Sequence, residues 1–223
     1  MWCIPPEQNA EFVCAMENVL EVYKRPYDPK RPVVCMDEKP KQLVKETRTP
    51  LACGPGQPQR FDFEYERNGT ANVFVFVEPL RGWRRVEVTE RRTRLDWARE
   101  VRQLIDVDYQ RAKKITLVMD NLNTHGPASL YEAFEPAEAR RLIEKLEITY
   151  TPKHGSWLNV AEVELAVLEK QSIGGRVPDA ATLRQRTKSW AQDRNAAKRK
   201  VNWQFTTDDA RIKLRRLYPQ VQT

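Results

Sequence analysis

Three carboxylates are the residues of this chain best suited to do chemistry. Asp37 and Asp120 each follow a short β-branched apolar run that is typical of a buried strand. Glu162 lies three residues after Asn159, a favourable helix N-cap, and so falls in the first turn of an expected helix. Because open α/β sheets place their sites at the carboxyl ends of strands, we expect these side chains to share one cleft.

Three carboxylates in one cleft repel each other unless a dense positive charge is present. Hard oxygen ligands suit Mg²⁺ or Mn²⁺ better than zinc, which favours His and Cys. Two such ions about 3.5–4 Å apart can activate a nucleophile and stabilise a leaving oxygen during phosphodiester displacement. The alternative is structural, with Asp37 and Asp120 solvating strand ends and Glu162 stabilising a helix N-terminus.

Two further carboxylates compete for the same roles. Glu164 lies about 200° around the helix axis from Glu162, so the two cannot point into one site. Glu38 follows Asp37 in the expected strand, where successive side chains point to opposite faces. Geometry therefore allows only one member of each pair, and it leaves the choice open.

The hydrophobic periodicity predicts an α/β fold, a mixed sheet flanked by helices. A Pro- and Gly-rich loop is expected over 40–59, and Asn68–Gly69 is expected to form a turn between antiparallel strands. Helices are predicted over 5–23, 95–107 and 136–145, from 158 or 159 onward, and over much of 179–218; strands are predicted over 31–39, 61–65, 71–77, 84–88, 115–120 and 148–150.

Three regions are expected along the 223 residues. A helical lead-in covers 1–30, the main domain covers 31–175, and a basic helical tail covers 176–223. The tail contains the runs 198–200 and 215–216, both made of Lys and Arg only. Its core candidates are Leu183, Trp190, Ile212, Leu214 and Leu217.

Composition favours a polyanionic partner. The net charge is +7, the isoelectric point is near 9.3 and the mean hydropathy is −0.70, and cations that neutralise phosphates release condensed counterions. No apolar run is long enough for a membrane span, and no signal peptide is recognisable, so a cytoplasmic protein is expected. The four cysteines form no C-x-x-C pair, which argues against a zinc site.

Three sequence blocks resemble the bacterial insertion-sequence transposases of the mariner superfamily. The first is Val33-Val34-Cys35-Met36-Asp37-Glu38, the second is Met119-Asp120-Asn121-Leu122-Asn123-Thr124-His125, and the third runs from Pro152 through Ser156-Trp157-Leu158-Asn159 to Glu162. The resemblance extends from about Trp2 to the helix after Glu162. The family commonly has Pro-Ile where this chain has Val160-Ala161, and its shortest Asp-to-Glu interval is shorter than the one here.

The resemblance implies an RNase H-like DDE catalytic domain that cuts transposon ends and joins them to target DNA. It implies that Asp37, Asp120 and Glu162 are the catalytic metal ligands, and it favours Asp37 over Glu38 and Glu162 over Glu164. The cofactor that the resemblance implies is Mg²⁺ or Mn²⁺, bound as two ions. The expected partner is double-stranded DNA, bound by a homodimer, in the bacterial cytoplasm at the nucleoid, with TA as the target.

Five residues beside these blocks are candidates for DNA or phosphate contact: Lys39, His125, Lys153, His154 and Trp157. The alternatives are a loop hydrogen-bonding role for the histidines, solvation for the lysines and core packing for the indole. The helix-turn-helix region that reads transposon ends in complete members is expected to be absent. Another RNase H-like nuclease, or an inactive or domesticated remnant that only binds DNA, remains the competing function.

Overall fold

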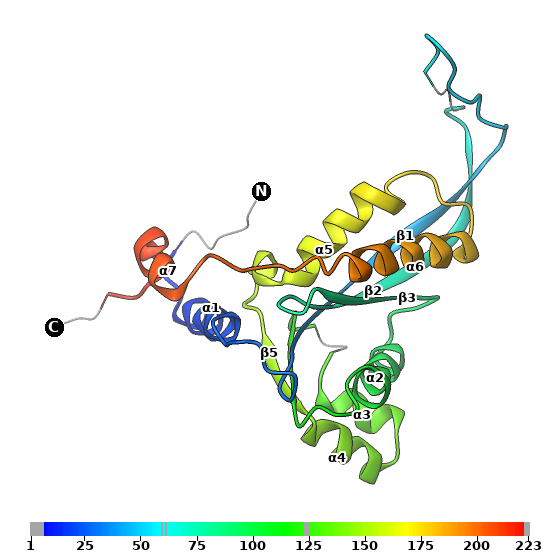
Figure 1. Ribbon diagram of the computed structural model, residues 1–223. Helices are drawn as coiled ribbons and strands as arrows, with labels where there is room; N and C mark the ends of the chain where they lie inside the picture. The colour runs from blue at the N-terminus through cyan, green and yellow to red at the C-terminus, as the bar shows by residue number, and fades with distance from the viewer. Residues whose placement is uncertain (1–6, 59, 61, 123–124, 221–223) are drawn as a thin grey trace.

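The protein, analysed as a computed structural model, is built on one five-stranded sheet in the order β3-β2-β1-β4-β5 (Figure 1). The structure describes residues 7–58, 60, 62–122 and 125–220. The first three strands pair antiparallel, and β1, β4 and β5 pair parallel. The strands are β1 Val33–Glu46, β2 Tyr65–Glu78, β3 Trp83–Thr89, β4 Ile115–Met119 and β5 Leu146–Tyr150.

Helices cover both faces of this sheet. The α-helices are α1 Ala10–Tyr23, α2 Arg94–Gln103, α3 Pro127–Ala133, α4 Pro136–Glu144, α5 Val160–Leu168, α6 Ala180–Ala196 and α7 Thr207–Lys213. Short π-helical segments extend α2 (η1 Leu104–Asp108) and α5 (η3 Glu169–Ile173), and the 3₁₀ turns are η2 Ser156–Leu158 and η4 Arg215–Leu217. The predicted mixed sheet flanked by helices is confirmed, and it is an RNase H-like arrangement.

The alternation of side chains along β1 separates the two layers. Val34 and Met36 pack in the core beneath α2, α3 and α4. Cys35 packs on the opposite face with residues of α1, α5 and α7. A third cluster joins α5 and α6 to the antiparallel strands. Asp37 follows the phase of Cys35 and therefore faces α5, whereas Glu38 faces α2, as strand geometry predicts.

The prediction that the first strand ends at residues 37–39 is wrong. β1 continues to Glu46 because it pairs with β2 as far as Glu46 opposite Tyr65. Its parallel pairing with β4 runs only from Val33 to Cys35, so beyond that point β1 is an edge on one side. Pro40 is tolerated there because a strand edge does not require its missing N–H. The expected loop over 40–59 is correspondingly shorter.

The prediction of a turn at Asn68–Gly69 is also wrong. Both residues lie inside β2, and the register between β1 and β2 shifts between Gln42 and Val44, opposite them. Gly69 has φ +87°, so the conformation that suggested a turn belongs to a bulge. The outer halves of β1 and β2 then form an arm that projects from the body (Figure 1). The strand expected from 61 begins at Tyr65, and Phe61 lies outside the described residues.

The terminal segments differ from the sequence prediction in detail. α1 begins at Ala10 rather than at residue 5, since the Asn9 side chain accepts a hydrogen bond from the Phe12 N–H. In the tail, Leu183, Trp190 and Leu217 are buried as expected. Ile212 is 77% exposed, so its assignment to the core is wrong. No helix among the described residues is long and apolar enough to cross a membrane.

Candidate active site

The two aspartates lie at neighbouring positions on the parallel half of the sheet. Asp120 directly follows β4, and Asp37 lies on β1 two residues beyond its last pairing with that strand, Cys35 opposite Val118. Glu162 is the third residue of α5, the helix that packs on β1 and β2 over the face that Asp37 points to. Three elements thus bring the three predicted carboxylates to one place.

Asn159 joins the strand of Asp37 to the helix of Glu162. Its side-chain Oδ1 accepts from the Ala161 N–H at 3.1 Å and caps α5, as the sequence predicts. Its Nδ2 donates to the Met36 carbonyl at 2.8 Å, directly before Asp37. Its own carbonyl accepts from the Glu162 N–H at 3.1 Å. Asn159 is fully buried, so this joint is shielded from water.

Tyr23 supports the same joint from α1. Its hydroxyl donates to the Leu158 carbonyl at 2.7 Å and lies 3.4 Å from the Val160 nitrogen, whose N–H it accepts. The hydroxyl also lies 3.4 Å from the Cys35 Sγ. α1 therefore braces the start of α5 against β1.

Each aspartate is held through one oxygen. Asp120 Oδ1 accepts from the Thr151 hydroxyl at 2.7 Å, and the Thr151 N–H donates to the Met119 carbonyl at 3.0 Å. Asp37 Oδ1 accepts from the Glu38 N–H at 2.8 Å. The second oxygen of each carboxylate takes no part in these bonds.

The site carries uncompensated negative charge. Burial raises the pKa of Asp37 to about 8, and repulsion from Asp120, Glu38 and Glu162 contributes to this rise. Such repulsion requires that the carboxylates lie close together. In the part of the chain that the structure describes, no Lys, Arg or His forms an ion pair with Asp37, Asp120 or Glu162.

This donor set fits a hard divalent cation, because it offers carboxylate oxygens and lacks a protein counter-charge. Among the described residues, no three His, Cys, Asp or Glu side chains already stand together in coordinating positions. Glu162 is exposed and forms no ion pair with a described residue, so its side chain can rotate toward the two aspartates.

Glu164 faces the other side of α5. It is 1% exposed, and its carboxylate binds the Arg84 guanidinium of β3 through two hydrogen bonds, at 2.9 and 3.1 Å. Arg194 of α6 donates to the same carboxylate at 2.9 Å. A glutamate that is buried and engaged by two arginines is not available to join Asp37 in a shared site.

Glu38 and His125 lie beneath the sheet, on the side of α2. His125 is 3% exposed and stacks on Trp97 with ring centroids 5.9 Å apart. Its Nε2 lies 3.6 Å from Glu38 Oε2, and Arg92 lies 3.6 Å from the other oxygen. Burial, with a smaller effect of Arg92, lowers the pKa of His125 to about 4, so the ring is neutral at pH 7. The His125 ring is buried in this structure, so it is not accessible to a DNA backbone.

The other residues considered for DNA contact lie on β1 beyond Asp37 and in the segment between β5 and α5. Lys153 and His154 are exposed in the loop between β5 and η2, and His154 has φ +64°. Lys39 forms an ion pair with Glu169 at 3.3 Å. Trp157 packs edge-on against Phe205, in agreement with the core-packing role that was the alternative to DNA contact. The second block's Asn123 and Thr124 lie outside the described residues.

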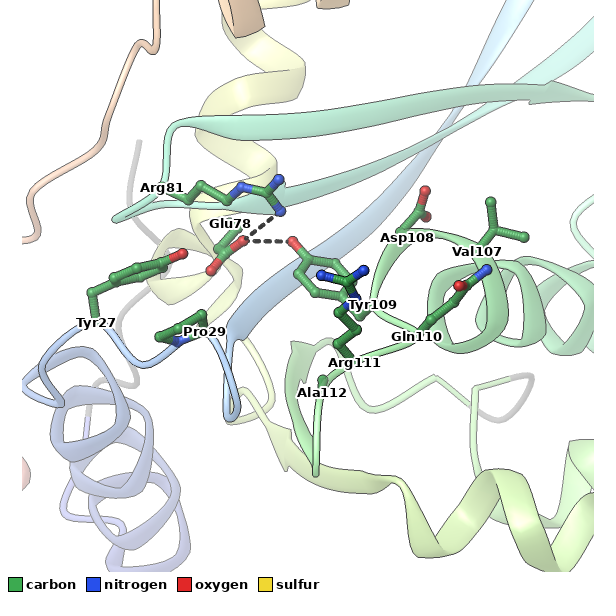
Figure 2. A pocket seen from close by; sticks show the side chains of 10 residues that line it. All are labelled: Tyr27, Pro29, Glu78, Arg81, Val107, Asp108, Tyr109, Gln110, Arg111 and Ala112. Atoms are coloured by element: carbon green, nitrogen blue, oxygen red, sulfur yellow. Dashed lines mark hydrogen bonds and ion pairs between the residues drawn. The ribbon is translucent and has the colours of Figure 1, made fainter.

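A separate pocket of about 350 Å³ lies at the opposite end of β1 and β4 (Figure 2). Its floor holds Glu78, which accepts from the Tyr109 hydroxyl at 2.7 Å and lies 3.6 Å from Arg81. Glu78 thus already has its partners. None of the predicted site residues lines this pocket.

Sequence reasoning missed Thr151, Tyr23 and the second role of Asn159. Thr151 directly follows β5, as Asp120 follows β4, and the two strands are parallel neighbours. That shared position at the end of a strand was an available signal for Thr151. The contacts of Tyr23 with Leu158 and Val160 and of the Asn159 amide with Met36 each span more than 120 residues of sequence, so no local pattern predicts them.

Comparison with solved structures finds complexes of the Mos1 mariner transposase. The paired-end complex with Mn aligns with a TM-score of 0.56 at 18% identity, over 88% of this chain and 60% of that chain. The strand transfer complex gives 0.58 at 16%, over 85% and 56%, and the paired-end complex with Mg gives 0.53 at 20%, over 98% and 66%. This chain thus spans less than two thirds of those chains, and the likeness establishes the fold.

A search of curated proteins finds no match. A family match, by contrast, covers more than half of the chain: the family described as DDE superfamily endonuclease matches residues 32–184. That range contains Asp37, Asp120 and Glu162 together with β1 to β5 and α5. The chain belongs to the DDE superfamily endonuclease family.

Proposed function

We propose that this chain is the catalytic core of a DDE transposase, which cuts DNA at a transposon end and joins the freed end to target DNA. The observation that carries the proposal is the convergence of Asp37, Asp120 and Glu162 without a protein counter-charge. The solved structures that share the fold are Mos1 complexes with paired transposon ends and a strand transfer complex, which supports the same reaction here.

In this proposal Asp37, Asp120 and Glu162 would hold Mg²⁺ or Mn²⁺, as two ions. The Mos1 complexes were solved with Mn and with Mg, which supports a divalent cation. When bound, the cations would supply the positive charge that activates a hydroxyl nucleophile and stabilises the leaving 3′-oxygen. The same site would serve water in the cutting step and the freed 3′-OH in the joining step.

Other residues of the chain then act by orienting the three carboxylates. Thr151 and the Glu38 N–H fix one oxygen of each aspartate and leave the other for the cation. Asn159 fixes the distance between the backbone beside Asp37 and the first turn of α5. Glu162 supplies the third carboxylate from a helix that Arg84 and Arg194 hold on its far side. Lys39, Lys153, His154 and Trp157 border the cleft where the substrate phosphates would lie, and His125 supports it from below.

The proposed partner is double-stranded DNA, both transposon ends and target, bound by a homodimer so that two ends meet. The proposed location is the bacterial cytoplasm, at the nucleoid. The proposed domain division remains 1–30, 31–175 and 176–223.

The test is Mn²⁺- or Mg²⁺-dependent cleavage of a duplex that carries the terminal repeat of the element encoding the chain. We expect Asp120→Asn to abolish cleavage while binding to an unrelated duplex stays intact, because the fold and the basic surface persist. Asp193→Asn, an exposed aspartate of α6, is the matched control. Undiminished cleavage by Asp120→Asn would contradict the assignment. Transfer of a labelled 3′ end into a plasmid distinguishes a transposase from a nuclease that only cuts.

A further inference from the structure

The positive charge of this chain is concentrated in one segment. Residues 176–200 contain eight Lys or Arg and two Asp or Glu, which gives +6 of the +7 net charge of the whole chain. The remaining 198 residues are close to neutral. A basic segment of this kind, on an otherwise balanced protein, is the electrostatic footprint expected for a polyanion.

The cations of this segment divide into two sets. Three have partners within the protein: Arg176 and Arg194 are partly buried and pair with Glu46 and Glu164, and Arg186 donates to the Arg176 carbonyl. Five others are exposed: Arg184, Lys188, Lys198, Arg199 and Lys200. Within residues 7–58, 60, 62–122 and 125–220, none of these five pairs with a carboxylate, although elsewhere many surface cations do. Their charge is therefore available to a ligand.

Two of the five exposed cations lie on the exposed side of α6, and the other three form the run that follows the helix. Leu183, Thr187 and Trp190 bury the opposite side of the helix against β3 and η3. Arg184 and Lys188 are four residues apart and so are neighbours on the helix surface. From Arg184 to the helix end is about 18 Å, at 1.5 Å per residue, and the run 198–200 continues from there (Figure 1).

The backbone of this run is fixed rather than loose. Arg84, which is 1% exposed, donates to the Arg199 carbonyl at 2.7 Å, and the Val201 N–H donates to the Pro79 carbonyl at 3.0 Å. Lys198 has φ +47° and lies against Gly82, where an added Cβ would come within 2.7 Å of the Lys198 carbonyl carbon. Three cations are thus displayed from a preorganised turn, which lowers the ordering cost of binding.

From this arrangement we infer that Arg184, Lys188 and the run 198–200 form a second DNA-binding surface, which contacts the phosphate backbone of the duplex outside the catalytic cleft. The inference rests on the proposed function, because that function supplies DNA as the polyanion. α6 covers the same face of the sheet as α5, and Arg194 links the two helices through Glu164. The surface and the catalytic helix therefore belong to one rigid layer.

The test measures binding of the full chain to an unrelated 30-base-pair duplex. Fluorescence anisotropy gives the affinity in EDTA over a range of salt concentrations. Each phosphate contact contributes about 0.9 to the slope of log affinity against log salt. We expect the triple variant Lys198→Gln, Arg199→Gln, Lys200→Gln to reduce this slope by about 2–3 and to weaken binding about tenfold or more at low salt. The double variant Arg184→Gln, Lys188→Gln should reduce the slope by about 1–2.

The control removes the same charge elsewhere. Arg111, Lys113 and Lys114 are exposed before β4 and form no ion pair with a described residue. Their triple glutamine variant should change the slope by less than about 0.5. Equal losses in the two triple variants, or wild-type binding by the 198–200 variant, would overturn the inference.

Gly82→Ala tests whether the fixed backbone of the run 198–200 contributes to binding, without changing the charge. The added methyl group must displace Lys198, so we expect weaker binding than wild type in protein shown by its melting curve to be folded. Wild-type affinity of Gly82→Ala would refute a preorganised run. If the unaltered chain binds DNA as described but fails to cut it with Mn²⁺, the proposed function fails and this surface stands. If the unaltered chain does not bind duplex DNA, both fail.

Discussion

Two glutamates on one helix show how position divides function from stability. Glu162 and Glu164 are separated by one residue on α5 and point about 200° apart. Glu164 is buried between Arg84 and Arg194. Glu162 is exposed beside two aspartates and forms no ion pair with a described residue. The same residue type thus completes a structural ion cluster on one face and leaves negative charge unneutralised on the other.

The two faces of α5 affect stability in different ways. Removing one partner of a buried ion cluster leaves the others desolvated and unpaired, which is strongly destabilising. Placing several carboxylates in one cleft already costs stability, and proteins accept this cost where a ligand uses the charge. Variants on the two faces of α5 should therefore affect different measurements.

The largest effect is expected from Glu162→Gln. Loss of the third carboxylate should lower the Mn²⁺-dependent cleavage rate by about 10³-fold or more, since a charged group in contact with the proposed cation is lost. The urea midpoint should not fall, because the side chain is exposed. Cleavage within threefold of wild type would show that Glu162 is not a ligand.

Glu164→Gln should have the converse effect. Arg84 and Arg194 would lose their counter-charge, and we expect the free energy of unfolding to fall by about 2–4 kcal/mol. Cleavage per folded molecule should persist at a temperature where the variant is folded. Urea denaturation measures the change, with Glu144→Gln on the exposed Arg140 pair as the control that leaves the midpoint in place. An unchanged midpoint for Glu164→Gln would contradict the importance of the buried cluster.

Asp37→Asn should stabilise the metal-free protein. Because the pKa of Asp37 is raised to about 8 in the folded state, the folded protein binds this proton more tightly than the unfolded chain does. The resulting penalty is absent below about pH 4, grows as the pH rises, and is complete above pH 8. In EDTA at pH 8 we expect a gain of about 1–3 kcal/mol, which disappears at pH 4. Asp193→Asn should show no such pH dependence.

Asn159 gives the smallest of the four effects. Asn159→Ala removes the cap of α5 and the donor to Met36, so stability should fall by about 1–2 kcal/mol. It should also raise the Mn²⁺ concentration needed for half of the metal-induced rise in melting temperature. Asn159→Ser keeps a capping acceptor but cannot reach Met36. If the serine variant retains the wild-type Mn²⁺ response, the link to β1 does not position the site.

The local parts of the site could be predicted from sequence. A strand followed by aspartate, and an asparagine three residues before a glutamate, are short-range patterns with direct physical causes, and both elements appear as expected. The length of β1 could not be predicted, because Pro40 and its polar neighbours become a strand only by pairing with β2. The Asn68–Gly69 pair was misleading, since positive φ serves a bulge as well as a turn. The burial of His125 against Trp97 depends on a helix that precedes it by about 30 residues.

The pairing of α1 with the end of the chain has a consequence for synthesis on the ribosome. The Asn9 N–H donates to the Leu217 carbonyl at 2.9 Å, and Glu17 binds Arg211 at 3.0 Å. At about 5–20 residues per second, α7 emerges on the order of ten to forty seconds after α1. Until then the apolar side of α1 lacks the cover of Ala210 and Leu217. Among the described helices, α1 is made before the others and is one of the last to be enclosed, so the contacts of Tyr23 with the start of α5 form before α1 is fully packed.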